Sequence, residues 1–112
     1  LVFQTLEEQI SVNMEDIFYF EYGQNRRVKL VATTGTWYLS SSMKSLEKQM
    51  QAYDFFVPHK SFLVNPGQIL SFGAEIQMKN HEMIPIAKNR RKQVHEQISA
   101  YLHNSLNINW RD

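Results

Sequence analysis

The segment from Phe55 to Asn65, FFVPHKSFLVN, constrains the fold more than any other part of the chain. Two apolar runs flank three polar residues, and Pro58 lies where the first run ends. Proline fixes its own φ and favours an extended residue before it, so the pattern predicts a turn at Pro58 held by buried residues on both sides. His59, Lys60 and Ser61 would then project from a rigid support toward an anionic partner. A solvated loop between two core strands would give the same pattern.

Length and composition limit the classes to which the protein can belong. The chain has 112 residues and no cysteine, which fits one domain over residues 1–112 and excludes disulfides, thiolate zinc sites and a cysteine nucleophile. No apolar run reaches the roughly 18 residues that a membrane span needs, and no signal-peptide pattern is present. We therefore expect a cytoplasmic protein without a membrane partner. Because the chain begins at Leu1, we also expect it to be a domain of a longer protein.

Apolar and β-branched residues alternate along most of the chain, and this pattern is typical of short strands. Pro85 lies within the last predicted strand and places that strand at an edge or a bulge. A hairpin is predicted about Gly73-Ala74, and Thr34-Gly35 is expected to connect two strands tightly. We expect one or two strands within 1–13 and further strands over 17–22, 27–33, 36–39, 69–72, 75–78 and 83–86.

Two helices are predicted. The first follows Ser40–Ser42, which supply candidate N-caps, and its apolar residues recur at helical spacing: Met43, Leu46 and Met50. The second is a C-terminal helix whose apolar face is expected to contain Val94, Ile98, Tyr101 and Leu102. Residues 104–112 have weak periodicity and are expected to fray. The whole pattern predicts a mainly β fold, a β-rich α+β arrangement of small antiparallel sheets with short helices.

The sequence gives little support to catalysis or metal binding. The four histidines, His59, His81, His95 and His103, show no metal-ligand spacing such as HExxH. His59 and Ser61 are too close along an extended segment to face each other as base and nucleophile. The glycines are scattered, so there is no Gly-rich phosphate loop. We expect no enzymatic activity, no metal and no cofactor.

A basic cluster precedes the last predicted helix. Lys88, Arg90, Arg91 and Lys92 place four cations within five residues. Cations at a helix N-terminus oppose the helix dipole, each costing about 0.3–1 kcal/mol when exposed. Such a local violation tends to mark function. Free backbone N–H groups and cationic side chains at this point suit a phosphate, although a solvated basic turn would look the same.

Two further basic spots lie far away along the sequence. Asn25-Arg26-Arg27 with Lys29 form one at a predicted hairpin turn, and His59-Lys60 form the other. If these loops converge with the basic cluster, they could enter the major groove of duplex DNA together. The hypothesis requires Arg27, Lys60 and Arg90 to lie on one side of the molecule, because a single duplex cannot touch opposing sides.

Several of these segments match a known family in order and spacing. The residues IFYFE at 17–21, HKSFLVN at 59–65 with Ile69, and IPI at 84–86 before the basic cluster resemble the LytTR DNA-binding domain. The resemblance covers about residues 9–102. Domains of this family form the output half of many bacterial response regulators in two-component systems. It implies an elongated fold of small antiparallel sheets, a receiver domain elsewhere in the protein, and dimers bound to promoter repeats in double-stranded DNA.

The resemblance also implies that loops, instead of a recognition helix, contact DNA. The residues expected to contact bases are Arg27, Lys60, Lys88 and Asn89. The residues expected to contact phosphates are Asn25, Arg26, His59, Ser61, Arg90 and Arg91. His59 could instead hold its turn together through its ring nitrogens, and Asn65 is expected to form a turn without touching DNA.

Two positions depart from the family pattern. Val57 stands where the family often has a basic residue, and Ala87 stands where a serine commonly caps the last helix. A missing cap costs about 1 kcal/mol unless Asn89 takes its place and the helix begins later.

Two other functions stay open at this point. The chain could be a protein-interaction module that uses its aromatic strands and sheet edges. It could also bind single-stranded nucleic acid, with exposed aromatic residues such as Tyr22 stacking on bases.

Overall fold

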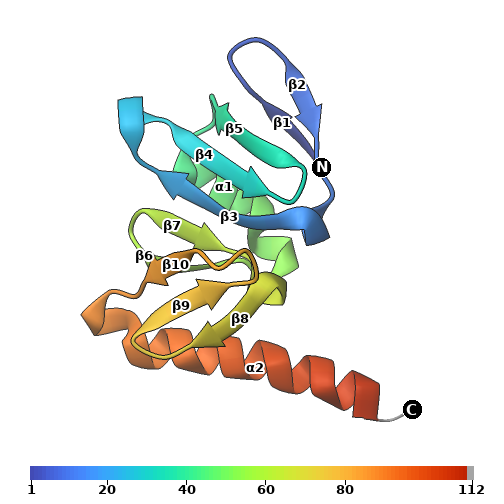
Figure 1. Ribbon diagram of the computed structural model, residues 1–112, viewed down its shortest axis with the longest axis vertical. Helices are drawn as coiled ribbons and strands as arrows, with labels where there is room; N and C mark the ends of the chain where they lie inside the picture. Colours follow the sequence, from blue (N-terminus) through green and yellow to red (C-terminus); the bar gives the residue numbers. More distant parts are fainter. Residues whose placement is uncertain (111–112) are drawn as a thin grey trace.

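The computed structural model describes the backbone of residues 1–110, and the side chains of residues 1–104 except Gln24. The fold is elongated, measuring 45 × 35 × 25 Å along its principal axes (Figure 1). Its strands are β1 (Val2–Gln4), β2 (Gln9–Ser11), β3 (Ile17–Tyr22), β4 (Val28–Ala32), β5 (Gly35–Leu39), β6 (Phe56–His59), β7 (Phe62–Val64), β8 (Ile69–Phe72), β9 (Glu75–Met78) and β10 (Met83–Pro85). Its α-helices are α1 (Met43–Met50) and α2 (Arg91–Trp110).

Short 3₁₀ segments connect many of these elements: η1 (Met14–Asp16), η2 (Gln24–Arg26), η3 (Gln51–Tyr53), η4 (Pro66–Gln68) and η5 (Lys88–Arg90). The strands form a five-stranded sheet in the order β5-β4-β3-β7-β6, a three-stranded sheet in the order β10-β9-β8, and the β1-β2 hairpin. Every strand pair is antiparallel. The prediction of a β-rich fold of small antiparallel sheets is therefore confirmed.

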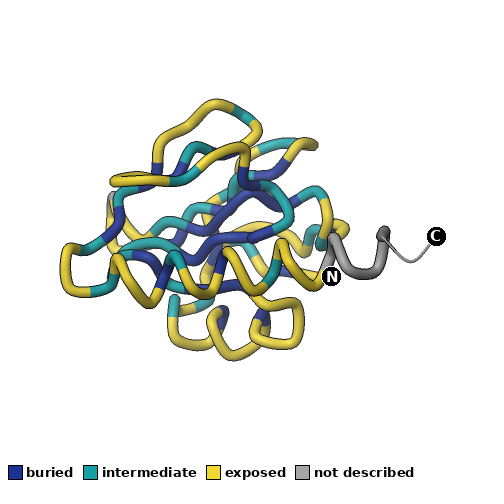
Figure 2. The backbone as a smooth tube through the Cα atoms, turned by 90° about the horizontal axis from the view of Figure 1, so that it is seen from below, coloured by how far each residue is buried: buried dark blue, intermediate teal, exposed yellow. Residues whose placement is uncertain are grey.

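The five-stranded sheet carries one core cluster on each face, because side chains alternate along its strands. Phe20, Leu30 and Leu63 belong to the cluster that packs against Leu46 and Met50 of α1. The cluster on the other face joins this sheet to the small sheet and to α2, and its members include Tyr19, Val64, Ile76, Val94 and Ile98. Figure 2 shows the result: buried strands lie inside, and exposed turns surround them.

The predicted turn at Pro58 was wrong. Pro58 is buried inside β6, and the chain reverses two residues later, at Lys60 and Ser61. Strand β6 lies at the edge of its sheet, and its pairing with β7 is irregular between Phe56 and His59. An edge strand tolerates a proline because one side of its backbone needs no ladder hydrogen bond. The prediction that Pro85 marks an edge strand is confirmed, since β10 ends the order of the small sheet.

The helix predictions are confirmed in part. Ser42 caps α1, where its hydroxyl accepts a hydrogen bond from the Ser45 N–H at 3.1 Å. Helix α2 is drawn to Trp110, which does not test the fraying expected from residue 104, and residues 111–112 lie outside the described residues. Its apolar face is narrower than predicted, because Leu102 is exposed. Within the described residues, no helix is both long and apolar enough to cross a membrane.

Asn65 joins three segments of the chain and is buried, with 2% of its surface exposed. Its Nδ2 donates to the carbonyl oxygens of Ile17 at 2.8 Å and Met14 at 3.3 Å. Its Oδ1 accepts from the Gly67 N–H at 2.9 Å, which closes the turn into η4. Asn65 is therefore a turn former, as predicted, and it also fixes the start of β3 beside the end of β7.

Candidate nucleic-acid interface

The three basic loops lie along one edge of the molecule. In Figure 1 they follow one another along the long axis on the left-hand side: the β3–β4 connection, the β6–β7 turn and η5. Hydrogen bonds hold neighbours together, from the Tyr22 N–H to the Ser61 oxygen at 2.8 Å and from the Ala87 N–H to the Pro58 oxygen at 2.9 Å. The backbone segments that carry Arg27, Lys60 and Arg90 therefore follow one another along the same edge.

The β3–β4 connection is a tight loop with unusual backbone geometry. The Gly23 N–H donates to the Arg27 oxygen at 3.1 Å, and the Arg26 N–H donates to the Gly23 oxygen at 3.2 Å. Asn25 and Arg26 both have left-handed backbones, with φ of 58° and 57°. Asparagine tolerates this region, but arginine rarely adopts it. The loop exposes the side chains of Asn25 and Arg26 and leaves Arg27 half-buried, directly before the start of β4.

The β6–β7 turn is closed by its own histidine. The Nδ1 atom of His59 accepts a hydrogen bond from the Ser61 N–H at 3.1 Å, and the His59 ring meets Phe62 edge-on at 5.9 Å between centroids. This geometry supports the structural role considered for His59. In the neutral tautomer that accepts at Nδ1, Nε2 carries a proton, so the same ring can also donate to a phosphate. Lys60 is exposed at the tip of the turn.

The η5 loop brings the basic cluster to the same edge. Lys88, Asn89 and Arg91 are exposed, whereas Arg90 is half-buried and its Nη1 donates to the Val57 oxygen at 3.1 Å. Ala87 stands at the N-cap of η5 and provides no side-chain capping bond, as its departure from the family pattern predicts. The α-helix then begins at Arg91 instead of at the first cation of the cluster.

The proposed contact residues keep their charge available for a partner. Among the described residues, the ion pair present joins Lys29 to Glu21 at 3.4 Å, across the β3–β4 ladder. Both side chains are about one-third exposed, at 32% and 33%, so the pair adds little stability. The sequence did not reveal this pair. It pairs Lys29 of the basic spot at the β3–β4 turn with an acid, while Arg26, Arg27 and Lys60 form no ion pair with any described residue.

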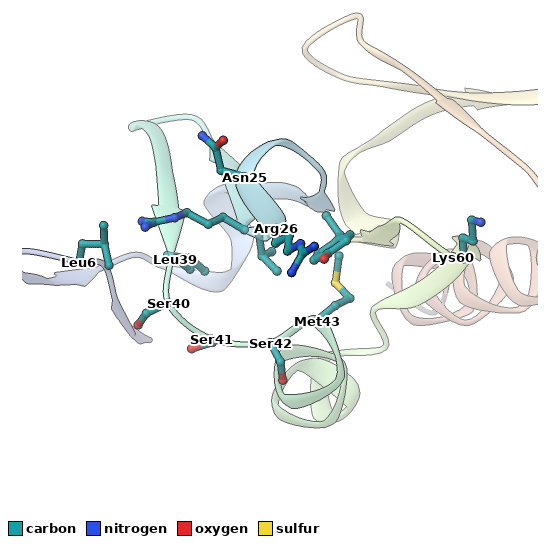
Figure 3. Close-up of a pocket in the computed structure, with 12 residues that line it drawn as sticks. Leu6, Asn25, Arg26, Leu39, Ser40, Ser41, Ser42, Met43 and Lys60 are labelled. Carbon is teal, nitrogen blue, oxygen red and sulfur yellow. The ribbon is translucent and has the colours of Figure 1, made fainter.

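Sequence reasoning missed a groove beside the interface. Its volume is about 610 Å³, and Arg26, Arg27 and Lys60 line it together with Ser40–Ser42 (Figure 3). The serines were expected only to cap α1. Their place opposite the β3–β4 loop depends on strand pairing between β4 and β5, which no local sequence signal reveals.

The described residues contain no group of three or more His, Asp or Glu side chains that could hold a metal ion.

Comparison with known proteins identifies the family. The sequence-family model described as the LytTr DNA-binding domain matches residues 7–99 of this chain. A solved LytTr DNA-binding domain, from a protein described as a methyl-accepting/DNA response regulator of Bacillus cereus, matches with a TM-score of 0.73 and 19% identity. This match covers 88% of the present chain and 94% of the other, and at such identity it establishes the fold alone. No curated protein matches significantly. The family match over most of its length shows that the chain belongs to the LytTR family of DNA-binding domains.

Proposed function

We propose that this chain binds double-stranded DNA in a sequence-dependent manner and inserts its loops into the major groove. The observation that carries the proposal is the row of three cationic loops on one edge, tied together by backbone hydrogen bonds. Duplex DNA is an extended polyanion, so cations spread along an edge match it better than they match a compact anion. Membership of a DNA-binding family supports the same conclusion.

The side chains divide by chemistry into two groups. We propose that Arg27, Lys60, Lys88 and Asn89 read base edges, because Arg and Lys suit guanine and Asn suits adenine. Phosphate contacts fix position without reading sequence, and we assign them to Asn25, Arg26, His59, Ser61 and Arg91. We also assign a phosphate contact to Arg90: one of its nitrogens donates to the Val57 carbonyl, and the others can still reach a phosphate.

The same proposal covers the setting in which the domain works. We propose that it is the output part of a cytoplasmic two-component response regulator whose receiver domain lies outside this chain. A single small domain offers few base contacts, so binding as a dimer to paired promoter repeats would supply the missing affinity. The resemblance to response-regulator output domains supports this setting.

The decisive experiment compares specific with random DNA. A preferred duplex is first selected from a random library, and fluorescence anisotropy then measures binding to it and to a scrambled duplex at about 50 mM and 200 mM salt. We expect Arg27→Ala and Lys60→Ala to weaken binding to the selected duplex by about 1–3 kcal/mol and binding to the scrambled duplex much less. Arg91→Ala should weaken both duplexes alike and flatten the salt dependence.

Three outcomes would contradict the proposal. Equal loss on both duplexes for all three variants would reject the division into base and phosphate contacts. Tighter binding to single strands, lost on changing Tyr22, would favour the single-strand alternative. No duplex binding, together with salt-insensitive binding to a protein, would favour an interaction module.

A further inference from the structure

The groove between the β3–β4 loop and the β5–α1 connection combines a cationic surface with an apolar one, and duplex DNA would need only the first. Its walls carry the cations Arg26, Arg27 and Lys60. Its apolar part contains Leu6, Leu39 and Met43. None of the twelve residues that line the groove is acidic. A phosphodiester backbone would use the cations and leave the apolar part unused.

Leu6 is the most informative member of this apolar part. It is 65% exposed, whereas Leu39 beside it is only 1% exposed. Figure 3 shows the Arg26 side chain extending above Leu39 toward the end of the groove at which Leu6 lies. A guanidinium and an exposed alkyl side chain thus face the same space. Hydrocarbon placed against Leu6 would leave water while its charged end meets Arg26.

We propose that this groove binds an amphipathic organic monoanion, a carboxylate carried on a hydrocarbon chain of medium length. The volume of about 610 Å³ lies within the range of small-molecule sites in proteins. The hydroxyls of Ser41 and Ser42 can donate to carboxylate oxygens that the cations do not reach, whereas the Ser40 hydroxyl already donates to the Gln4 oxygen at 3.2 Å. The absence of lining carboxylates removes the repulsion that would otherwise oppose an anion.

Occupation of the groove has a consequence for DNA binding, and this part rests on the proposed function. Arg26, Arg27 and Lys60 line the groove and are also proposed DNA contacts. A carboxylate that engages Arg26 and Arg27 would neutralise charge that the duplex needs. The ligand and DNA would therefore exclude each other, and the ligand would act as a negative effector.

The first experiment measures ligand binding without DNA. Decanoate below its micellar concentration is titrated into the 112-residue chain and followed by ¹H–¹⁵N NMR, with acetate and decanol as probes that lack the tail or the charge. We expect saturable decanoate shifts centred on Leu6, Arg26 and Ser40–Ser42, and only weak shifts with either control. Non-saturating shifts, or equal shifts with decanol, would overturn the proposal.

A matched pair of variants separates the groove from general hydrophobic binding. Leu6→Gln removes exposed apolar surface inside the groove, and Leu70→Gln removes it from β8, where Leu70 is 52% exposed. We expect Leu6→Gln to weaken decanoate binding about fivefold or more and Leu70→Gln to change it less than about twofold. Equal effects of the two changes would reject the site. Neither residue is a proposed DNA contact.

The second experiment adds the selected duplex. Saturating decanoate should weaken wild-type DNA binding, and Leu6→Gln should reduce that inhibition while leaving DNA affinity alone unchanged. Decanoate binding with no effect on DNA binding would retain the ligand site and reject the exclusion. If the chain binds no duplex at all, the first experiment still decides whether the ligand site exists, so the two proposals fail separately.

Discussion

The Arg90 guanidinium donates a hydrogen bond to the backbone carbonyl of Val57 over 3.1 Å and thereby joins η5 to the edge strand β6. A second bond between the same segments runs from the Ala87 N–H to the Pro58 oxygen at 2.9 Å. Strand β6 leads directly into the turn that carries Lys60. Arg90 therefore helps to set the position of Lys60 relative to Lys88 and Asn89, a role that its exposed neighbour Arg91 does not share.

Arg90→Ala should lower the free energy of unfolding by about 1–2 kcal/mol, because it removes a charge-assisted hydrogen bond and leaves the Val57 carbonyl without that donor. Arg91→Ala is the matched control and should change stability by no more than about 0.5 kcal/mol, since Arg91 is exposed. Urea unfolding followed by circular dichroism measures both. If the two variants are equally stable, the bond to Val57 contributes nothing to the fold.

Because the backbone at Arg26 is left-handed, we expect two substitutions there to differ in stability. Its φ is 57°, a region that costs non-glycine residues about 1–2 kcal/mol and costs glycine little. Arg26→Gly should therefore be about 1 kcal/mol more stable than Arg26→Ala in thermal or urea unfolding. Both variants lose the same cation, so both should lose the same DNA affinity. Equal stability of the two variants would show that the loop relaxes out of this conformation.

Periodicity along single strands was enough to predict much of this fold. Val28, Leu30 and Ala32 are buried and alternate with partly exposed neighbours, as their spacing indicated. The location of Pro58 inside β6 was missed, because a proline marks a turn or an edge strand equally well and only the sheet order decides which. The Arg90–Val57 bond was missed for a related reason, since it joins residues 33 positions apart.

The candidate site shows the same limit. Sequence identified the basic loops, and a resemblance assigned them to DNA, but their common edge follows from how β3 pairs with both β4 and β7. The place of Ser40–Ser42 opposite the β3–β4 loop could not be predicted, because it depends on the β4–β5 register. The ion pair that withdraws Lys29 from the basic surface likewise depends on a cross-strand register with Glu21.

We expect a carboxylate at position 65 to destabilise the fold in a pH-dependent manner. In Asn65→Asp an ionised carboxylate would face the carbonyl oxygens of Ile17 and Met14, with no N–H to donate to them. We expect a loss of about 2–4 kcal/mol at neutral pH. Burial and these oxygens raise the pKa of the new carboxyl group in the folded state, so the variant should regain stability relative to wild type as pH falls toward about 4.

Asn65→Ala is the control for that pH dependence. It removes the same hydrogen bonds but introduces no titratable group, so its stability deficit should stay constant with pH. Urea unfolding of both variants and wild type over the range from about pH 4 to 7 measures the difference. A constant deficit in Asn65→Asp as well would mean that the introduced carboxylate escapes to solvent.

The raised pKa of Tyr19 leads us to expect that the folded protein loses stability in alkali. Burial first, and then the charges of Glu82 and Glu21, raise the pKa of Tyr19 to about 12. The unfolded chain has an ordinary tyrosine pKa of about 10, so the folded state holds the phenol proton more tightly. The stability that this provides is fully present below about pH 10 and is lost as pH rises through 12, by up to about 3 kcal/mol.

Tyr19→Phe keeps the ring and removes the titration, so its unfolding free energy should fall less between about pH 10 and 12 than that of wild type. The comparison also needs a matched change that removes the hydroxyl of another tyrosine. Tyr53→Phe serves because Tyr53 lies in η3 with 36% of its surface exposed, whereas 5% of the Tyr19 surface is exposed. Urea unfolding at closely spaced pH values should give Tyr53→Phe the wild-type slope and Tyr19→Phe a shallower one. Identical slopes for all three proteins would show that the Tyr19 hydroxyl reaches water freely and that burial does not control its proton.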